Sequence, residues 1–258
     1  MRAEERDARR RVVHIQVHST DEAASRAGAA SFVEQARRAV EARRRFSVAL
    51  SGGDTPRRMY AMLAEEPFVS RVAWDRVHVF WGDDRGVPQD HERSNYRMAH
   101  DALISRVAIP ASNVHRMRGE IAAEEAAALY ERELAEHFRG APGVFDLVHL
   151  GIGNDGHTAS LFPDTKALDE RERSVVATVD LSHGDEPRIT VTFSIINAAR
   201  RVEVLVLEPE KADVVRRAIE GDEPPASLPA KAIAPRGELV WMLTEDVARG
   251  LTPKARST

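Results

Sequence analysis

The sequence contains no cysteine, and this absence removes several kinds of site from consideration. Disulfide bonds, thiolate metal ligands and thiol nucleophiles all require cysteine. No apolar run approaches the roughly 18 residues that a membrane-spanning helix needs. The formal net charge of −4 argues against a dedicated nucleic-acid-binding face, which is usually basic. We therefore expect neither a membrane protein nor a nucleic-acid-binding protein.

Several catalytic motifs are absent as well. The sequence has no GxSxG nucleophile elbow, no GxxxxGK[ST] phosphate loop and no HExxH metal motif. The 10 histidines are scattered without the spacing of metal ligands. These absences favour non-covalent chemistry that uses neither a metal ion nor another cofactor.

The first eleven residues, MRAEERDARRR, carry charges of both signs and lack the apolar segment of a signal peptide. Their acidic residues also argue against an organelle transit peptide. We expect a flexible charged arm over 1–11, a single α/β domain over 12–250 and a tail over 251–258. We also expect a cytoplasmic protein that is a monomer or a weak homodimer.

Short apolar runs alternate with helical patterns, which is typical of a mainly parallel sheet flanked by helices. The continuous apolar run FDLVHL (145–150) suits a central strand buried on both faces. After residue 174 the pattern changes, because three strand-like runs follow with little helix before the last one. These runs span 175–180, 188–193 and 202–207, and we expect a small antiparallel section there. Other expected strands are 12–17, 46–50, 77–81 and 239–243, and other expected helices begin near 21, 56, 95, 120 and 210.

Three loops follow predicted strands, at the edge of an open α/β sheet where ligands bind. The first is SGGDTP (51–56). Its glycines allow a sharp turn, Asp54 or Thr55 can cap the next helix, and Pro56 suits the first helical turn. The free amides at such a helix start can bind phosphate, although an ordinary strand-to-helix turn has the same features.

The second loop contains Asp83, Asp84 and Arg85 directly after an aromatic-rich strand. Arg85 suits bidentate contact with phosphate. The two carboxylates could orient arginines or substrate hydroxyls. A solvated surface loop would have the same composition, so the position after the strand is what favours a ligand site.

The third loop, GIGNDGH (151–157), matches the dinucleotide fingerprint GxGxxG literally. Pro163 would stop any helix within two turns, and the motif lies in the middle of the chain, so we do not expect NAD binding. His157 is more informative, because an imidazole at this edge can titrate near neutral pH. Asp155 could orient its ring or an attacking water, although a lone histidine is often structural.

Two further basic residues are weaker candidates for contacts with a ligand. Arg188 lies near the start of a predicted strand, after Pro187. Lys211 lies in the first turn of a predicted helix, where a cation is unfavourable unless an anion is nearby. Each could also be an ordinary surface charge.

Taken together, these motifs resemble the 6-phosphogluconolactonase family, which belongs to a superfamily with the glucosamine-6-phosphate deaminases. DGHTASLFP is specific to the family, whereas SGGxTP is shared more widely. The resemblance runs in order from about residue 14 to 245. It is carried by SGGDTP, the segment from Phe80 to Tyr96, GIGNDGHTASLFP, PRIT (187–190) and EKA (210–212).

The resemblance implies a modified Rossmann-like α/β sandwich that hydrolyses 6-phosphoglucono-δ-lactone to 6-phosphogluconate, in the oxidative pentose phosphate route. It implies His157 as general base. From the residues themselves we expect Asp155 to assist it, and no metal or other cofactor to take part. Two departures stand out: Asp54 replaces the usual serine or threonine, and the family's DER-like segment reads DDR here, with the shorter acid Asp84 in place of glutamate. The resemblance implies substrate contacts, chiefly to phosphate, from the glycine loop with Ser51, Gly52, Gly53 and Thr55, and from Arg85, Arg188 and Lys211. We also expect Asp83 and Gly156 at the substrate.

Two other functions share part of this sequence pattern. A glucosamine-6-phosphate deaminase would carry AFNEP after the histidine, which supplies a catalytic glutamate, whereas this chain has TASLFP. A sugar-responsive transcription regulator would need a DNA-binding helical module, and an eleven-residue arm cannot hold one. The lactone hydrolase is therefore the predicted function.

Overall fold

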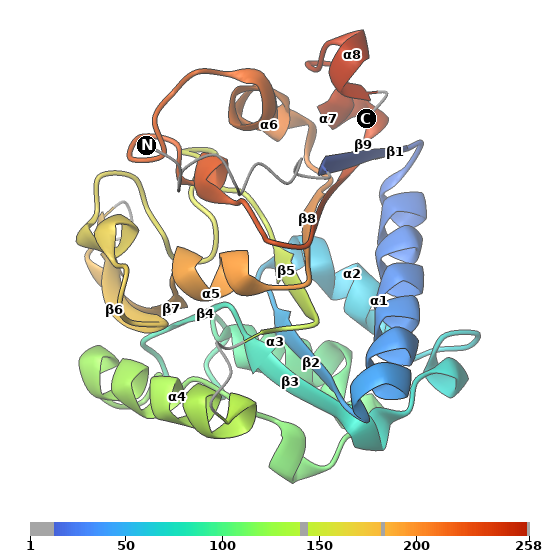
Figure 1. The fold of residues 1–258 in the computed structure, drawn as a ribbon, viewed down its shortest axis with the longest axis vertical. Helices are drawn as coiled ribbons and strands as arrows, with labels where there is room; N and C mark the ends of the chain where they lie inside the picture. The colour runs from blue at the N-terminus through green and yellow to red at the C-terminus, as the bar shows by residue number, and fades with distance from the viewer. Residues whose placement is uncertain (1–12, 140–143, 182–183, 257–258) are drawn as a thin grey trace, which may run out of the picture.

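The computed structural model describes residues 13–139, 144–181 and 184–256, so the expected charged arm lies outside the described residues. A parallel sheet of six strands forms the centre, in the order β1-β9-β8-β5-β2-β3 (Figure 1). The expectation of a mainly parallel sheet is thus confirmed. Its strands are β1 (Val13–His18), β2 (Phe46–Leu50), β3 (Val77–Trp81), β5 (Leu147–Leu150), β8 (Arg201–Val206) and β9 (Glu238–Thr244).

Helices cover both faces of this sheet, and the sheet separates two hydrophobic cores. One core contains buried side chains of α1 (Asp21–Arg43), α2 (Asp54–Leu63) and α3 (Asn95–Ala102). The other core contains those of α4 (Ala123–Phe138), α5 (Phe193–Ala198), α6 (Ala212–Glu220) and α7 (Glu245–Ala248). A short helix, α8 (Pro253–Arg256), occupies the expected tail. Single-turn 3₁₀ helices are η1 (Val69–Arg71), η2 (Trp74–Arg76), η3 (Ile104–Arg106), η4 (Ala111–Asn113), η5 (Lys166–Asp169), η7 (Pro209–Lys211) and η8 (Pro229–Ala232).

The residues of β2 show why the chain forms a two-faced sheet. Successive strand residues point to opposite faces, so Val48 and Leu50 join the core beside α1 and α2, and Ala49 joins the core beside α4. All five residues of β2 are buried. Burial on both faces accounts for the mostly apolar sequence. Ser47 is the polar exception; its main-chain N–H donates to Asp146, and its hydroxyl hydrogen-bonds to His137.

A second sheet has three antiparallel strands in the order β4-β7-β6: β4 (Asp83–Arg85), β7 (Glu186–Val191) and β6 (Val175–Asp180). It confirms the predicted antiparallel section, but the assignments of two segments were wrong. The run 202–207 lies mostly in β8 of the parallel sheet, because α5 precedes it and provides the crossover. Residues 83–85, expected as loop, pair with β7.

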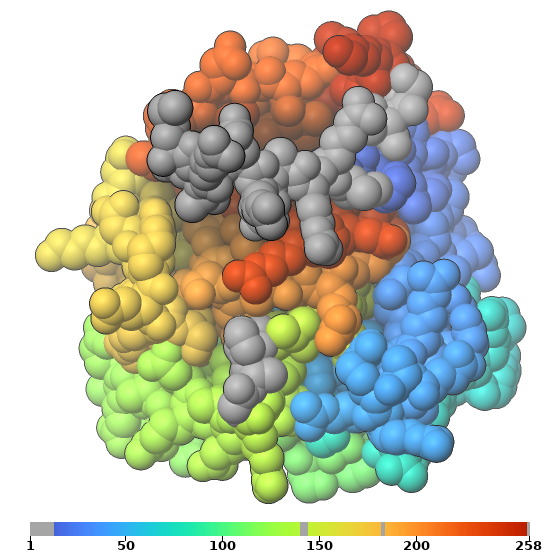
Figure 2. Space-filling view, in the orientation of Figure 1, coloured from blue at the N-terminus to red at the C-terminus, as the bar shows by residue number. Residues whose placement is uncertain are grey.

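The small sheet lies at one side of the molecule, opposite α1. Figure 2 shows this arrangement on the surface, with the segment around β6 and β7 in yellow and α1 in blue on opposite sides. Within the described residues, no helix combines the length and the apolar character that crossing a membrane would require.

Candidate active site

A cavity of about 490 Å³ lies beyond the carboxyl ends of the central strands. Leu150 and Leu205, near the ends of β5 and β8, form part of its wall, and its polar groups come from the segments that follow β2, β3, β5 and β8 and from the small sheet. Parallel strands end at one edge of a sheet, so segments far apart in the sequence meet there. This is the edge at which the sequence predicted a site.

The turn between β2 and α2 contributes Ser51, Gly52, Gly53 and Thr55 to the cavity, as expected. Gly53 is the N-cap residue of α2 and adopts a φ of 90°, which glycine tolerates without strain. No side chain caps this helix, so the prediction that Asp54 or Thr55 caps it was wrong. The Asp54 side chain is 94% exposed and pairs with Arg57, because an uncapped first turn points it into solvent.

Gly52 allows a close approach between this turn and the start of α3. A Cβ atom at Gly52 would overlap the side-chain amide of Asn95. That amide accepts a hydrogen bond from the Arg85 guanidinium and donates one to the main-chain carbonyl of Asp83, at 2.9 Å. The absence of a side chain at Gly52 therefore lets Asn95 position Arg85 at the cavity.

Asp84 acts as an anchor for the start of α3. Its carboxylate accepts hydrogen bonds from the main-chain N–H groups of Arg85, Asn95 and Tyr96, at 2.8, 2.7 and 3.0 Å, and from the Ser94 hydroxyl at 3.3 Å. Burial raises the pKa of Asp84 to about 6, although these N–H donors oppose the shift. Ser94 caps α3. Asp84 thus holds the loop rather than facing a ligand.

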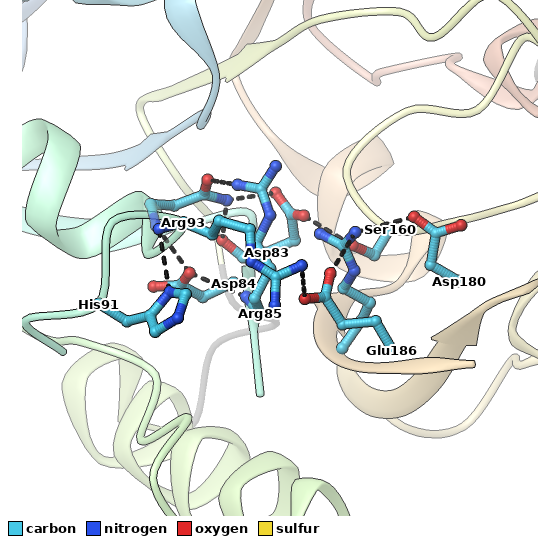
Figure 3. A network of polar contacts seen from close by, with 10 residues as sticks. Asp83, Asp84, Arg85, His91, Arg93, Ser160, Asp180 and Glu186 are labelled. Carbon is cyan, nitrogen blue, oxygen red and sulfur yellow. Dashed lines mark hydrogen bonds and ion pairs between the residues drawn. The ribbon is translucent and has the colours of Figure 1, made fainter. Parts of the chain in front are cut away.

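Asp83, in β4, links this strand to the loop after β5. Its carboxylate accepts a hydrogen bond from the Ser160 hydroxyl at 2.6 Å, and both residues line the cavity (Figure 3). Asp83 is 7% exposed. A buried carboxylate needs such donors to offset its lost hydration, so this bond fixes the loop after β5 against β4.

Arg188 lies in a buried charge network rather than at the surface. Its guanidinium pairs with Asp180 at 2.8 Å and with Glu186 at 2.7 Å, and Arg93 pairs with Glu186 at 2.5 Å (Figure 3). All four residues line the cavity. Arg188 is 6% exposed, so the two carboxylates that neutralise it also fix its orientation.

Lys211 faces the same cavity from the other side. It is the N-cap residue of α6, and its ammonium lies 3.2 Å from Glu208. Glu208 also accepts a hydrogen bond from the Thr55 hydroxyl. Burial raises the pKa of Glu208, but the Thr55 bond and the charge of Lys211 outweigh this and lower it. The carboxylate supplies the anion that a cation at a helix start requires.

His157 and Asp155 form a hydrogen-bonded pair. Nδ1 of His157 lies 2.6 Å from Oδ1 of Asp155, which also accepts the main-chain N–H of His157 at 3.1 Å. Burial raises the pKa of Asp155, but these bonds and the histidine charge lower it overall. A proton on Nδ1 leaves the lone pair of the imidazole on Nε2. The ring packs against Phe162, at 4.7 Å between centroids, and lines the cavity.

The glycines around this pair fold the loop tightly without forming a dinucleotide site. Gly153 and His157 are joined by a main-chain hydrogen bond of 2.9 Å, and no helix directly follows the loop in this described part of the chain. Gly156, expected at the substrate, does not line the cavity. It has a φ of 84°, and its carbonyl accepts a hydrogen bond from Ala230. Its role is in the backbone turn.

The structure therefore brings almost all predicted site residues to one cavity, with Gly156 outside its lining and Asp155 behind His157. Sequence reasoning missed several polar residues. Asn95 and Arg93 flank Ser94, the N-cap residue of α3, and their place at a helix start was a usable signal. Asp180, Glu186, Ser160 and Glu208 reach the cavity only through the tertiary fold.

Comparisons with known proteins agree with this arrangement. The family described as glucosamine-6-phosphate isomerases/6-phosphogluconolactonase matches residues 19–241. A 6-phosphogluconolactonase of Synechocystis is 41% identical over 220 residues, covering 84% of this chain and 89% of that protein. The human 6-phosphogluconolactonase is 40% identical, with 82% of this chain and 83% of that protein covered.

A solved structure of 6-phosphogluconolactonase from Trypanosoma brucei superimposes with a TM-score of 0.82 at 30% identity, over 93% of this chain and 98% of that one. The sequence matches and the structural superposition therefore indicate the same family over nearly the whole described chain. The chain belongs to the glucosamine-6-phosphate isomerase/6-phosphogluconolactonase family, and within it to the 6-phosphogluconolactonases.

Proposed function

We propose that this protein hydrolyses 6-phosphoglucono-δ-lactone to 6-phosphogluconate, and that His157 is its general base. The contact between Asp155 and Nδ1 of His157, at 2.6 Å beside a cavity lined by four cationic side chains, carries this proposal. A δ-lactone is an activated ester, so its hydrolysis needs a positioned water, a base and stabilisation of negative charge. The related lactonases support the choice of substrate.

In the proposed reaction, Nε2 of His157 removes a proton from a water molecule as the water oxygen bonds to the lactone carbonyl carbon. The tetrahedral intermediate then collapses, and the bond between that carbon and the ring oxygen breaks. The imidazolium returns the proton to the ring oxygen, which becomes a hydroxyl. Asp155 keeps the ring in the required tautomer and stabilises the imidazolium through its charge.

The oxyanion of the intermediate has two candidate partners. Arg188 is charged and rigidly held, but Asp180 and Glu186 already neutralise much of its charge. The main-chain N–H of Gly53 lies at the open start of α2, where amides are available. Either donor would stabilise charge that develops only during the reaction.

The phosphate of the substrate is assigned to the turn 51–55 together with Arg85 and Lys211. The uncapped N-terminus of α2 offers free N–H groups and the positive end of the helix dipole. Among the described residues, Arg85 forms no ion pair with a carboxylate, and its guanidinium is held by Asn95. Such a clamp fixes the lactone relative to His157.

The test generates 6-phosphogluconolactone in situ and follows acid release slightly below neutral pH, with glucosamine 6-phosphate as a parallel substrate. We expect faster lactone opening without added metal and no ammonia release. Ammonia release without lactone opening would instead indicate a deaminase and overturn the proposed reaction.

A His157→Asn variant tests the general base separately. General-base catalysis typically contributes about 10²- to 10⁴-fold, so kcat should fall by that amount while KM changes little. A matched variant is His100→Gln, since His100 is a surface histidine beside Asp101 that does not line the cavity. Near-normal lactonase rates in His157→Asn would rule out this role for the imidazole.

A further inference from the structure

Three histidines meet in the fold on the side of β3 covered by α4, away from the proposed active site. His78 belongs to β3, His115 follows η4, and His137 is in the last turn of α4. One nitrogen from each ring can be chosen so that all three lie within 4.8 Å of one another. These residues are 37 and 22 positions apart, so only the tertiary structure reveals the cluster.

The distances within this histidine cluster suit a metal ion. Nδ1 of His78 lies 3.2 Å from Nε2 of His115. A tetrahedral zinc ion with Zn–N distances of about 2.0–2.1 Å places its ligand nitrogens about 3.3 Å apart. Two of the three rings therefore already have the required separation, and the nitrogen chosen from the third ring lies within 4.8 Å of those chosen from the other two.

A carboxylate fixes the tautomer of the central ring. Nδ1 of His115 lies 2.6 Å from Oε1 of Glu133, so it donates its proton there and Nε2 carries the lone pair. Metal-bound histidines usually have such a carboxylate partner on the other nitrogen. The Ser47 hydroxyl, 2.7 Å from Nε2 of His137, similarly orients the third ring.

The cluster is partly buried and faces charged groups of both signs. Burial is the main cause that lowers the pKa of His78 to about 4 and that of His137 to about 3, with further contributions from Arg45 and the neighbouring imidazoles. Of the charged groups that face the cluster, Arg45 opposes a cation and Glu133 favours one.

Aromatic packing alone does not explain this arrangement. Phe80 stacks on His115 at 4.2 Å and contacts His137 at 4.9 Å between ring centroids. Phenylalanine would fill the same space without a polar nitrogen to satisfy. Instead, three imidazoles direct nitrogens toward one another.

The cluster is separate from the lactonase site. His78 lies near the amino end of β3, whereas the cavity lies beyond its carboxyl end, a separation of roughly 10 Å along the strand alone at about 3.3 Å per residue. None of the three histidines lines the cavity. Metal bound here would join β3, the segment after η4 and α4, and would not touch the substrate.

We propose that His78, His115 and His137 form a binding site for a divalent transition metal ion of the zinc class, with Glu133 orienting His115. Three imidazoles favour zinc, copper or nickel over magnesium or calcium, which prefer oxygen ligands. On binding, the ion replaces the proton between His78 and His115, and His78 carries that proton on Nε2 instead. The site stabilises the fold, since an ion that binds only the native state raises its stability.

The test uses the full chain, treated with a chelator and dialysed, and then titrated with ZnCl₂ in a calorimeter. CoCl₂ provides a second probe, because a tetrahedral cobalt site absorbs visible light strongly. We expect one equivalent to bind and the thermal midpoint to rise until the site is saturated. Absence of binding to the wild-type chain, or binding without tetrahedral cobalt bands, would overturn the proposal.

Variants locate the site. His115→Gln and His137→Gln should weaken zinc binding by at least tenfold, and Glu133→Gln by about 10- to 100-fold, whereas Arg45→Gln should strengthen it. His100→Gln and His157→Asn serve as controls and should bind zinc as the wild type does. Without metal, the cluster variants should melt cooperatively and keep wild-type lactonase activity, which separates this site from the proposed reaction. If His157→Asn lost zinc binding while the cluster variants kept it, the ion would lie in the lactonase cavity and the proposal would be overturned.

Discussion

Asp155 holds Nδ1 of His157 at 2.6 Å from one of its carboxylate oxygens, and that same oxygen also accepts the main-chain N–H of His157. A single carboxylate oxygen thus fixes both the backbone and the ring of one residue. Gly153 permits this geometry, because a Cβ atom there would overlap the His157 ring. The pair is preorganised before any substrate binds.

The first prediction concerns this pair. In Asp155→Asn the ring keeps a hydrogen-bond acceptor but loses the charge that stabilises the imidazolium. Hydrogen bonds to charged groups contribute about 1.5–3 kcal/mol, so kcat should fall roughly 10- to 100-fold with little change in KM. Steady-state kinetics provide the measurement, with the exposed Asp169→Asn as control. An unchanged kcat would show that Asp155 does not assist His157.

The second prediction concerns Gly52. In Gly52→Ala the new methyl group displaces the Asn95 amide, and Arg85 then loses its positioning partner. We expect KM to rise by roughly tenfold, in line with about 1.5 kcal/mol for a weakened charged hydrogen bond, and kcat to change less. The matched control is Gly82→Ala, whose Cβ would meet only the Leu50 carbonyl oxygen at 3.7 Å. Equal KM values in both variants would contradict the proposal that Gly52 leaves room for Asn95 to position Arg85.

The third prediction concerns the pH dependence of stability. Burial raises the pKa of Asp84 to about 6 from an ordinary value of 3.8, so the folded chain binds this proton more tightly than the unfolded chain does. The resulting stability is present below about pH 4 and is lost as the pH rises to about 6. Relative to Asp84→Asn, the wild-type free energy of unfolding should fall by on the order of 3 kcal/mol across this range.

Urea denaturation of both proteins at several pH values measures this difference. Because the amide introduced by the Asp84→Asn substitution cannot ionise, other titrating groups contribute equally to both curves and cancel. A stability difference that stays constant between pH 4 and 6 would show that Asp84 titrates normally in the folded protein.

The fourth prediction concerns the buried charge network. Arg188→Gln leaves the carboxylate of Asp180 without the Arg188 guanidinium, although Arg93 still pairs with Glu186. Breaking one partner of a buried ion pair costs about 3–5 kcal/mol, and we expect a loss of this size in urea denaturation. The double variant Arg188→Gln/Asp180→Asn should recover part of the loss. Equal stability of the single and double variants would mean that the pair is not coupled.

Comparison of sequence and structure shows which features could be predicted. The alternation of apolar strands and helical patterns indicated the parallel sheet, because strand and helix periodicities are local properties. The glycine turns after β2 and β5 marked the ligand edge for the same reason. The role of 202–207 was misjudged, because the six-residue helix α5 before it is too short to give a clear helical pattern.

The site residues also divide into those that local sequence could predict and those that depend on tertiary packing. His157 and Asp155 are two positions apart, and their pairing was predictable because one short loop holds both. The cap of α2 was wrongly predicted, since the backbone at Gly53 turns Asp54 outward. Asn95 was missed because its contact with Arg85 depends on how α3 packs against the turn after β2.

The sequence by itself determined the α/β class, the position of the ligand edge, the absence of thiol chemistry and the histidine in the glycine loop. Each of these depends on residue type and on spacings of a few positions. Only the tertiary structure decided that Arg188 is neutralised by Asp180 and Glu186, and that His78, His115 and His137 meet beside α4. Such contacts depend on how elements distant in sequence pack together, and no local pattern encodes them.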